Sequence, residues 1–324
     1  MKRLHLQIEL NDYCNADCIM CCIKAHDTGF RNKIGHGNMD TNTVLKLIKE
    51  FRDIKADIKE ITIPWAGEPT IHPDFPIIIR ILLEQDFCHV NLVTNGIAMN
   101  EELIDIILKY SVHRTHKFNI LFSIDAATKD TYKNIKKTDN FDKLIKQIDK
   151  LISKREIATM KFPTLLLQFI LMEENKEELE DFKILCKELF KTINYYESNN
   201  NNKINTDKDG YNIRLLGWHG DSKTKSIEEL AKLNSIIIHP DNKIDNSLPC
   251  SMVFENLNFH WSGVAVPCCN DLGIRNSLGV FPQNSLEEIL NSSTRKWFQK
   301  KHLSGKRNEI NLCKNCCVFQ EYKF

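Results

Sequence analysis

Three cysteines near the start of the chain lie close enough together in sequence to bind one metal centre. Cys14, Cys18 and Cys21 form a Cys-x3-Cys-x2-Cys pattern directly after an apolar alternation over residues 4–10. That alternation predicts a strand, so the cysteines occupy the loop at its carboxyl end, where parallel α/β folds build their sites. Three thiolates can bind three irons of a cubane iron–sulfur cluster and leave the fourth iron open to another ligand.

A structural zinc site is the alternative for these cysteines. Closed zinc sites usually combine Cys-x2-Cys pairs and need a fourth protein ligand. Cys22 is a candidate for that ligand, but adjacent cysteines are strained when both bind one ion. The spacing therefore favours the iron–sulfur cluster over zinc.

The twelve cysteines also bear on the compartment of the protein. Residues 1–10 are too short and too regular for a signal peptide, and no apolar run approaches the roughly 20 residues that span a membrane. We expect a cytoplasmic protein, because clustered cysteines in a reducing compartment bind metal more often than they form disulfides. The 44 Lys and Arg balance 43 Asp and Glu, and a net charge of +1 does not favour nucleic acid or an anionic membrane as the main partner.

Short apolar runs alternate with helical periodicity over the first 195 residues. The expected strands are Leu4–Leu10, Glu60–Pro64, His89–Val93, Asn119–Ser123 and Leu165–Leu171. The expected helices are Thr43–Phe51, Pro76–Glu84, Glu101–Lys109, Phe141–Ser153 and Lys176–Phe190. Repeated βα units predict a parallel sheet with right-handed crossovers. The length fits a partial (β/α)6 TIM-like barrel better than a complete barrel, which takes about 250 residues.

The remaining chain divides into two parts. Residues 196–245 are expected to be a linker with the last core elements: a loop over Glu197–Tyr211, a sixth strand over Asn212–Leu216 and a helix over Ser226–Asn234. Residues 246–324 are expected to form a small cysteine-rich domain. It contains a turn at Gly263 that closes a predicted hairpin, and a predicted helix over Ser285–Lys301.

The first cysteine pattern is similar to the cluster motif of the radical S-adenosylmethionine (SAM) superfamily, with Met20 at a position that is usually aromatic. The resemblance implies that Cys14, Cys18 and Cys21 bind a [4Fe–4S] cluster whose open iron is chelated by SAM. An electron delivered through the cluster would cleave SAM to a 5′-deoxyadenosyl radical, which abstracts hydrogen from the substrate. The implied electron donor is a protein such as flavodoxin or ferredoxin.

Strand-end motifs in the same part of the chain resemble family segments that bind SAM. Residues 65–69, Trp-Ala-Gly-Glu-Pro, look like the family's Gly-Gly-Glu-Pro motif, and residues 94–96 and 123–125 resemble segments that line the SAM pocket. Lys136 lies where many relatives have an Arg near the SAM carboxylate. The cofactor contacts implied by the resemblance are Ala66, Gly67, Glu68, Thr94, Asn95, Ser123, Asp125 and Lys136. Ordinary turns are the alternative for the glycine-containing segments, and Asn175, at a family-like position, is alternatively a helix cap.

A second cysteine set lies near the carboxyl end. Cys250, Cys268, Cys313 and Cys316 come from separated stretches and can close a second cubane cluster completely. The spacing from Gly263 to Cys268 is similar to the opening of an auxiliary-cluster domain of the SPASM or shorter twitch type. Because few residues follow Cys316, the twitch arrangement with one auxiliary [4Fe–4S] cluster fits better than the full SPASM form. A zinc ribbon uses the same kind of ligand set and is the alternative.

The resemblance indicates the cofactors and the radical chemistry better than it indicates the substrate. It favours a small polar substrate, a sugar or cyclitol, that is dehydrogenated or epimerised. Cys269 is a candidate hydrogen-atom donor, as a thiol is in radical epimerases, although a cysteine next to a presumed ligand is more often buried packing. His260, Trp261, Arg214 and His219 are candidate substrate contacts. The alternatives are modification of a ribosomally made peptide, by epimerisation or cross-linking, and a non-catalytic metal-binding module.

Overall fold

The computed structural model describes residues 3–21, 23, 31–191, 196–198, 208–215, 247–314, 316 and 322. The strands are β1 (Arg3–Ile8), β2 (Ile58–Ile63), β3 (His89–Thr94), β4 (Phe118–Ser123), β5 (Thr164–Leu171), β6 (Tyr196–Ser198), β7 (Gly210–Leu215), β8 (Asn256–Phe259), β9 (Val264–Val266) and β10 (Gly279–Val280). The helices are α2 (Arg31–Ile34), α3 (Thr41–Asp53), α4 (Phe75–Gln85), α5 (Glu101–Ser111), α6 (Lys129–Lys136), α7 (Phe141–Ile157), α8 (Leu179–Phe190), α10 (Met252–Glu255), α11 (Leu286–Leu290) and α12 (Ser293–Leu303). Three 3-10 turns, η1 (Pro69–Ile71), η2 (Lys176–Glu178) and η3 (Arg307–Glu309), complete the described elements.

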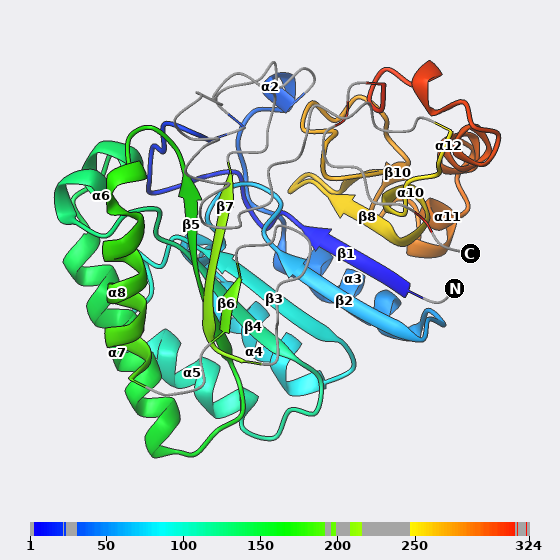
Figure 1. Ribbon diagram of the computed structural model, residues 1–324. Helices are drawn as coiled ribbons and strands as arrows, with labels where there is room; N and C mark the ends of the chain where they lie inside the picture. Colours follow the sequence, from blue (N-terminus) through cyan, green and yellow to red (C-terminus); the bar gives the residue numbers. More distant parts are fainter. Residues whose placement is uncertain are drawn as a thin grey trace.

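These strands form one sheet with the order β10-β9-β8-β1-β2-β3-β4-β5-β7-β6 (Figure 1). All neighbours from β8 to β6 are parallel, whereas β8, β9 and β10 pair in antiparallel fashion. Helices α3, α4, α5, α7 and α8 connect successive strands on one face of the sheet, as right-handed crossovers require (Figure 1). The predicted fold class, a partial TIM-like barrel with a cysteine-rich region after it, is confirmed.

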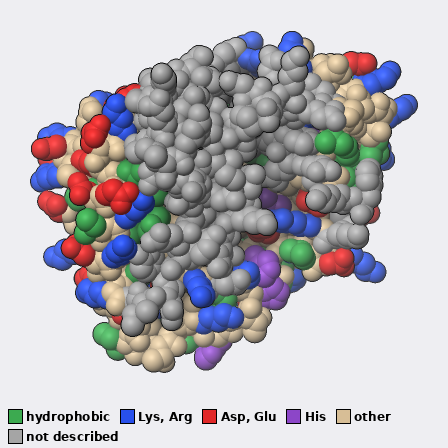
Figure 2. Space-filling model, viewed as in Figure 1, with side chains coloured by type: hydrophobic (Ala, Val, Ile, Leu, Met, Phe, Trp, Pro, Cys, Tyr) green, Lys and Arg blue, Asp and Glu red, His purple; other side chains and the backbone are tan. Residues whose placement is uncertain are grey.

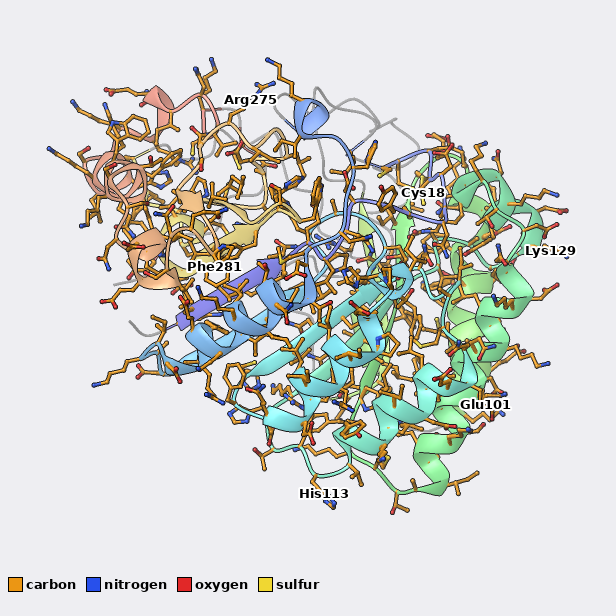
Figure 3. All side chains as sticks on the ribbon, turned by 180° about the vertical axis from the view of Figure 1, so that it is seen from behind. Cys18, Glu101, His113, Lys129, Arg275 and Phe281 are labelled. Carbon is orange, nitrogen blue, oxygen red and sulfur yellow. The ribbon has the colours of Figure 1, made fainter. Side chains whose placement is uncertain are left out.

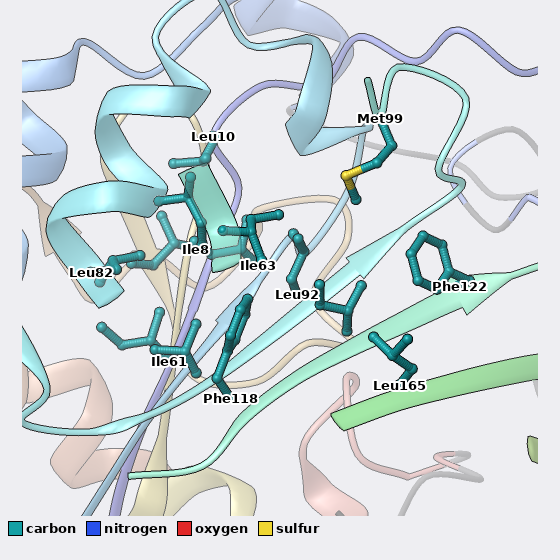
Figure 4. Packing of buried hydrophobic residues seen from close by; sticks show 14 of the residues in the cluster. Ile8, Leu10, Ile61, Ile63, Leu82, Leu92, Met99, Phe118, Phe122 and Leu165 are labelled. Carbon is teal, nitrogen blue, oxygen red and sulfur yellow. The ribbon is translucent and has the colours of Figure 1, made fainter. Parts of the chain in front are cut away.

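The apolar core lies between the sheet and these helices. Strand residues alternate between faces, so every second residue of β1, beginning at Leu4, is buried against α3 and α4. Figure 4 shows Ile61, Ile63, Leu92 and Phe118 of the central strands packed beside Leu82 of α4. Burial of this face leaves the other face of each strand for polar residues, and that face carries the site.

Side-chain caps start the helices at the carboxyl ends of the strands. Asp40 accepts a hydrogen bond from the Thr43 amide at the start of α3, and Asn100 accepts one from the Leu103 amide at the start of α5. Thr128 caps α6, a helix that periodicity alone did not predict. Each cap fixes where a βα loop ends, and these loops surround the site described below.

The carboxyl-terminal region joins the same sheet through β8. His5 of β1 lies opposite Asn256 of β8, and their side chains are linked by a 3.0 Å hydrogen bond between Nδ1 and Nδ2. The expected hairpin at Gly263 is present as β8 and β9. The predicted domain bounds at 195 and 245 stay predictions, but strand pairing attaches the cysteine-rich region directly to the edge strand of the barrel.

Four local expectations concern the last part of the chain. The single helix predicted over Ser285–Lys301 is two helices, because Ser292 caps a new helix by accepting from the Arg295 amide directly after α11 ends. The predicted loop over Glu197–Tyr211 begins and ends in strands, β6 and β7. The predicted sixth strand is β7. The predicted helix over Ser226–Asn234 lies outside the described residues.

Among the described helices, none has the length and apolar character needed to cross a membrane.

Candidate functional site

The cysteine loop that follows β1 is held at both of its ends by backbone hydrogen bonds. The amides of Asp17 and Ile19 donate to the carbonyl oxygens of Lys136 and Ile135, over 2.9 and 3.0 Å, at the end of α6. The Tyr13 carbonyl accepts from the Glu68 amide over 2.7 Å. The loop that carries Cys14, Cys18 and Cys21 therefore spans from the loop after β2 to the end of α6. Figure 3 places Cys18 at the end of the molecule opposite His113.

Gly67 brings the loop after β2 into close contact with the chain just before the cysteines. Its φ angle is +73°, and a Cβ there would lie 2.2 Å from the main-chain oxygen of Asn11 and 2.9 Å from that of Tyr13. Asn11 Nδ2 also donates to the Glu68 carbonyl over 3.2 Å. A side chain at position 67 is excluded both by backbone conformation and by space. The close approach expected of Gly67 is present, and its partner is the cysteine-bearing segment.

The Glu68 carboxylate points into the protein and is almost fully buried. Its Oε1 accepts from Thr70 Oγ1 and from Thr94 Oγ1, both over 2.6 Å, and its Oε2 accepts from the Asn95 amide over 2.7 Å. Burial raises the pKa of Glu68, and these hydrogen bonds oppose the rise. Glu68 thus fixes the ends of β2 and β3 together. A direct contact between Glu68 and SAM stays a prediction.

Asn95, directly after β3, reaches the cysteine loop. Its Nδ2 lies 3.7 Å from Cys14 Sγ and donates to Asn15 Oδ1 over 2.7 Å, while its Oδ1 accepts from the Ile97 amide. A side-chain amide that donates to a sulfur ligand stabilises the thiolate form and tunes the cluster bound there. Asn95, a predicted cofactor residue, is therefore next to the predicted cluster ligand Cys14, whereas Thr94, the other predicted residue of this turn, contacts Glu68.

Asp125 and Lys136, two predicted SAM contacts, form a buried ion pair with each other. The Lys136 ammonium donates to Asp125 Oδ2, and Asp125 Oδ1 accepts from the Ile170 amide over 2.7 Å. Burial lowers the pKa of Lys136, but Asp125 and Cys18 outweigh that effect and raise the pKa overall. The pair ties α6, and with it the cysteine loop, to β4 and β5. Contact of either group with SAM stays a prediction.

The other predicted contacts lie along the same edge of the sheet. Ala66 is buried after β2, and Ser123 is half-buried at the end of β4, in register with Gln168 of β5. Asn175 makes no side-chain cap to η2. Instead its Nδ2 donates to the carbonyl oxygens of Asp125 and Ile170 over 2.9 and 2.8 Å. The capping alternative for Asn175 is therefore wrong.

Asn212 of β7 is a site residue that the sequence did not single out. It lies opposite Gln168, which lies opposite Ser123, so three polar side chains share one level of the polar face. The Asn212 side chain has no exposed surface, and within the described residues its Oδ1 and Nδ2 have no hydrogen-bond partner. A buried amide without a partner costs about 1–3 kcal/mol, unless a ligand or water satisfies it. A polar residue between the buried Tyr211 and Ile213 was the available signal.

The second cysteine set surrounds one cavity. Its lining includes all four predicted ligands: Cys250, Cys268, Cys313 and Cys316. Cys269 lines the same cavity. Asn270 Nδ2 donates to Cys316 Sγ over 3.6 Å. The geometry brings together sulfur donors from three separate stretches, as a cubane cluster requires.

His302 of α12 supports this cavity from inside the domain. Its Nδ1 accepts from the Cys250 amide over 3.0 Å, so the ring proton is on Nε2, which lies 3.6 Å from Cys313 Sγ. Burial lowers the pKa of His302 to about 4, so the ring is neutral at neutral pH. It is therefore placed to donate to the Cys313 sulfur, the kind of contact that tunes a metal ligand.

Each set contains thiols whose pKa is raised by burial. Burial raises the pKa of Cys18 to about 11, although Lys136 opposes the rise, and burial raises the pKa of Cys313 to about 12. Binding of iron must therefore displace protons from these thiols. Among the described residues, no three His, Cys, Asp or Glu side chains are gathered to hold a single metal ion. In a cubane each thiolate binds a different iron, so the ligands of a cluster stand further apart than those of one zinc ion.

Cys269 lies where the two halves of the site meet. The Trp65 indole Nε1, from the loop after β2, donates to the Cys269 carbonyl over 2.9 Å. Burial lowers the pKa of Arg214 at the end of β7, and the nearby Cys269 opposes this. Arg214 is thus the predicted substrate contact that lies close to Cys269.

The other predicted substrate contacts are placed differently. His260 is fully buried, with Nε2 3.4 Å from Glu9 Oε1, and its Nδ1 lies 2.7 Å from Ser262 Oγ. The Trp261 ring packs against Gly37, where an added Cβ would lie 2.4 Å from it. His219 lies outside the described residues. His260 and Trp261 therefore attach the cysteine-rich region to the segments around β1.

Comparisons with solved structures agree with this architecture. The crystal structure of BtrN in complex with AdoMet and 2-DOIA superposes with a TM-score of 0.55 at 16% identity, over 98% of this chain and 94% of that chain. Native anSMEcpe with bound AdoMet gives a TM-score of 0.60 at 14% identity, over 97% of this chain and 89% of that chain. SuiB from Streptococcus suis gives 0.62 at 12% identity, over 90% of this chain and 66% of that one. At these identities the likeness concerns the fold.

Among curated sequences, a probable GTP 3′,8-cyclase of Saccharolobus islandicus (strain Y.N.15.51) is 27% identical over 184 residues, which are 57% of this chain and 53% of that protein. One from Metallosphaera sedula is 27% identical over 173 residues, 53% of this chain and 48% of that protein. The chain thus spans about half the length of these relatives.

Family models match both parts of the site. The model of an iron–sulfur cluster-binding domain, SPASM, covers residues 250–317, and the model of the radical SAM superfamily covers residues 8–185, more than half of the chain. The cofactors of the chain are accordingly SAM, a [4Fe–4S] cluster that binds it and an auxiliary iron–sulfur cluster. The loop after β1, the four-cysteine cavity and the family models lead to one conclusion: this chain is a radical SAM enzyme and belongs to the radical SAM superfamily.

Proposed function

We propose that the enzyme abstracts a hydrogen atom from a small polar substrate, a sugar or cyclitol, and thereby dehydrogenates or epimerises it. The SAM-binding cluster, held by Cys14, Cys18 and Cys21, supplies the electron that cleaves SAM and so generates the abstracting radical. The auxiliary cluster would be held by Cys250, Cys268, Cys313 and Cys316. A one-electron carrier and a reducing, cytoplasmic compartment are part of this proposal.

The buried, unpartnered amide of Asn212 is the observation that carries the choice of substrate. Asn212 lies two residues before Arg214 on β7, and Gln168 of β5 lies opposite Asn212. Within the described residues, Arg214 makes no hydrogen bond or ion pair. Amide donors and acceptors together with a guanidinium suit a compact ligand that carries several hydroxyl groups. Burying these groups without such a ligand would be unfavourable.

Two residues have distinct roles in the proposal. Arg214 orients the substrate, since its guanidinium presents donors in a fixed plane. Cys269 determines the outcome. If its thiol returned a hydrogen atom to the substrate radical, the product would be an epimer, and the remaining thiyl radical would take one electron from the one-electron carrier and one proton. If it did not, the substrate radical would give one electron to the auxiliary cluster and a hydroxyl proton to a base, and the product would be a ketone.

The first experiment is anaerobic turnover with SAM, a reductant and a panel of sugars and cyclitols deuterated at the carbinol carbons. The proposal expects one deuterium in 5′-deoxyadenosine and a product that is either a ketone or an epimer carrying hydrogen from solvent. A Cys269→Ala variant should lose the epimer but still form a ketone. Deuterium transfer from no member of the panel would count against a polyol substrate.

Peptide modification is the second candidate, because one similar structure is anSMEcpe with bound AdoMet and the Kp18Cys peptide, with a TM-score of 0.60 at 14% identity. The same deuterium assay separates the two candidates. Peptides labelled at their α-carbons would transfer deuterium to 5′-deoxyadenosine where the polyols do not.

A further inference from the structure

The exposed side of α12 combines basic and apolar side chains. Lys296 and Lys300 are exposed there, and the side chains of Trp297 and Leu303 have exposed fractions of 45% and 54%. The Lys301 ammonium lies over the Trp297 ring, 5.9 Å from its centroid. We call this surface, Lys296, Trp297, Lys300 and Leu303, the α12 face.

The buried side of the same helix contacts the auxiliary-cluster cavity. His302 lines that cavity and reaches Cys313. An outer hollow, with Trp297 in its wall, shares Asn270 and Leu312 with the cavity. Asn270 and Leu312 therefore line both the cysteine cavity and the hollow beside Trp297. The α12 face thus lies on the outer side of the cavity wall, where an electron carrier, but not a substrate, would approach the cluster.

The segment that contains α12 is much more basic than the chain as a whole. Residues 293–314 contain seven Lys and Arg against one acidic residue, Glu309, although the whole chain has a net charge of +1. Lys301 and Lys306 pair with Glu309, while Lys296 and Lys300 have no ion pair in the described part of the chain. On the opposite side of the molecule, around α6 and α7, Lys residues are interspersed with acids, as Figure 2 shows. Figure 3 shows nitrogen-tipped side chains extending outward from α12.

We propose that the α12 face is the docking surface for an acidic one-electron carrier protein that exchanges electrons with the auxiliary cluster. The proposal rests on the auxiliary cluster and is independent of the substrate. In the reductive direction, one electron leaves the reduced carrier, which is oxidised, and enters the auxiliary cluster, which is reduced. No bond and no proton has to move. Complementary charge steers the encounter, and Trp297 and Leu303, on the two sides of the lysines, provide apolar contact.

The test measures how fast reduced flavodoxin, a strongly acidic carrier, reduces the clusters of the holoenzyme in anaerobic stopped flow at low ionic strength. The Lys296→Glu/Lys300→Glu variant reverses the charge of the α12 face. A Lys143→Glu/Lys146→Glu variant makes the same change in net charge on α7, at the far side of the molecule (Figure 1). Reduction by dithionite and the iron content of each variant report whether the clusters are intact.

We expect the α12 variant to lose at least about 10-fold in the second-order rate with flavodoxin and to lose most of its salt dependence. Its iron content and its rate with dithionite should match those of the parent, and the α7 variant should react like the parent. Equal effects of the two variants, or no effect of the α12 variant, would overturn the proposal. Zero-length carboxylate–amine cross-linking provides a second measurement: cross-links should map to Lys296 and Lys300, and a map confined to other lysines would contradict it.

The failure of this proposal is distinguishable from the failure of the proposed function. The flavodoxin assay contains no substrate and follows only the cluster absorbance. A polyol substrate can thus be refuted while the docking surface stands, and the reverse also holds.

Discussion

The indole Nε1 of Trp65 donates a hydrogen bond to the main-chain oxygen of Cys269, over 2.9 Å and across 204 positions of sequence. Trp65 belongs to the loop that contacts the segment carrying the predicted ligands of the SAM-binding cluster, and Cys269 follows a predicted ligand of the auxiliary cluster. A single hydrogen bond thus connects the two cofactor regions at the point where the substrate is proposed to bind. The contact fixes the backbone of Cys269, on which the direction of its thiol depends.

The first prediction concerns this bond. Trp65→Phe retains an aromatic ring but leaves the Cys269 carbonyl without its donor, which should cost about 1 kcal/mol. We expect the melting temperature to fall by about 1–2 °C and the ratio of epimer to ketone to change. Trp297→Phe, on the exposed face of α12, is the matched control and should change neither. If both variants behave alike, the bond has no influence on Cys269.

The close approach of the loop after β2 gives a second prediction with an internal control. Gly67→Ala places a methyl group 2.2 Å from the Asn11 carbonyl at a φ of +73°. Gly35→Ala has a similar φ of +80° and no atom within 4 Å. Both variants bear the conformational cost of about 1 kcal/mol, but only Gly67→Ala must also displace the cysteine-bearing segment.

We therefore expect Gly67→Ala to lose iron from the SAM-binding cluster and to raise KM for SAM at least about 10-fold, the equivalent of about 1.4 kcal/mol. Gly35→Ala should retain both values within a factor of about two. Iron and sulfide quantification with 5′-deoxyadenosine kinetics measures this. Equal iron loss in both variants would mean that backbone conformation alone is responsible.

The third prediction separates a structural from a cofactor-binding role for Lys136. Lys136→Met leaves Asp125 buried without its counter-charge and should lower the free energy of unfolding by about 3–5 kcal/mol. Lys133→Met, on the same helix, removes an exposed pair with Asp139 and should cost less than about 1 kcal/mol. Asp125→Asn combined with Lys136→Met should recover part of the loss, because no charge then remains buried.

Urea unfolding of the three variants measures these differences. If Lys136→Met costs no more than Lys133→Met and instead raises KM for SAM, Lys136 acts on the cofactor. Its predicted role near the SAM carboxylate would then be supported over its role in holding α6.

How far the sequence predicts this structure depends on whether the information is local. The alternation of strands and helices from β1 to β5 can be predicted from the periodicity of apolar residues, and the cysteine spacings indicate both cofactor regions. The pairing of His5 with Asn256, 251 positions apart, cannot be predicted from any local sequence pattern. The same holds for Asn212, whose position opposite Gln168 follows only from the strand register. The division between α11 and α12 could have been predicted from the sequence, because Ser292 is a favourable helix N-cap within an otherwise helical pattern.

The fourth prediction concerns His302. Its Nε2 is directed at Cys313 Sγ, and a hydrogen bond to a cluster ligand makes the reduced cluster more stable. His302→Leu should therefore lower the reduction potential of the auxiliary cluster and leave the SAM-binding cluster unchanged. His113→Leu, remote from both clusters, is the control. A redox titration followed by electron paramagnetic resonance resolves the two clusters, and an unchanged potential in His302→Leu would show that the contact does not tune the metal.

The last prediction assigns each cysteine set to its own cluster. Two cubanes give about eight irons per chain, so Cys18→Ala and Cys268→Ala should each retain about four. Cys18→Ala should form no 5′-deoxyadenosine, because its loss removes the cluster that SAM chelates. Cys268→Ala should still cleave SAM with dithionite but fail to turn over the substrate to a ketone. Cys88→Ala, a buried cysteine outside both sets, is the control and should retain all the iron and both activities. Loss of SAM cleavage in Cys268→Ala, with the iron of the first cluster still present, would mean that the auxiliary cluster is required for the first step and that the two sites do not divide the reaction in this way.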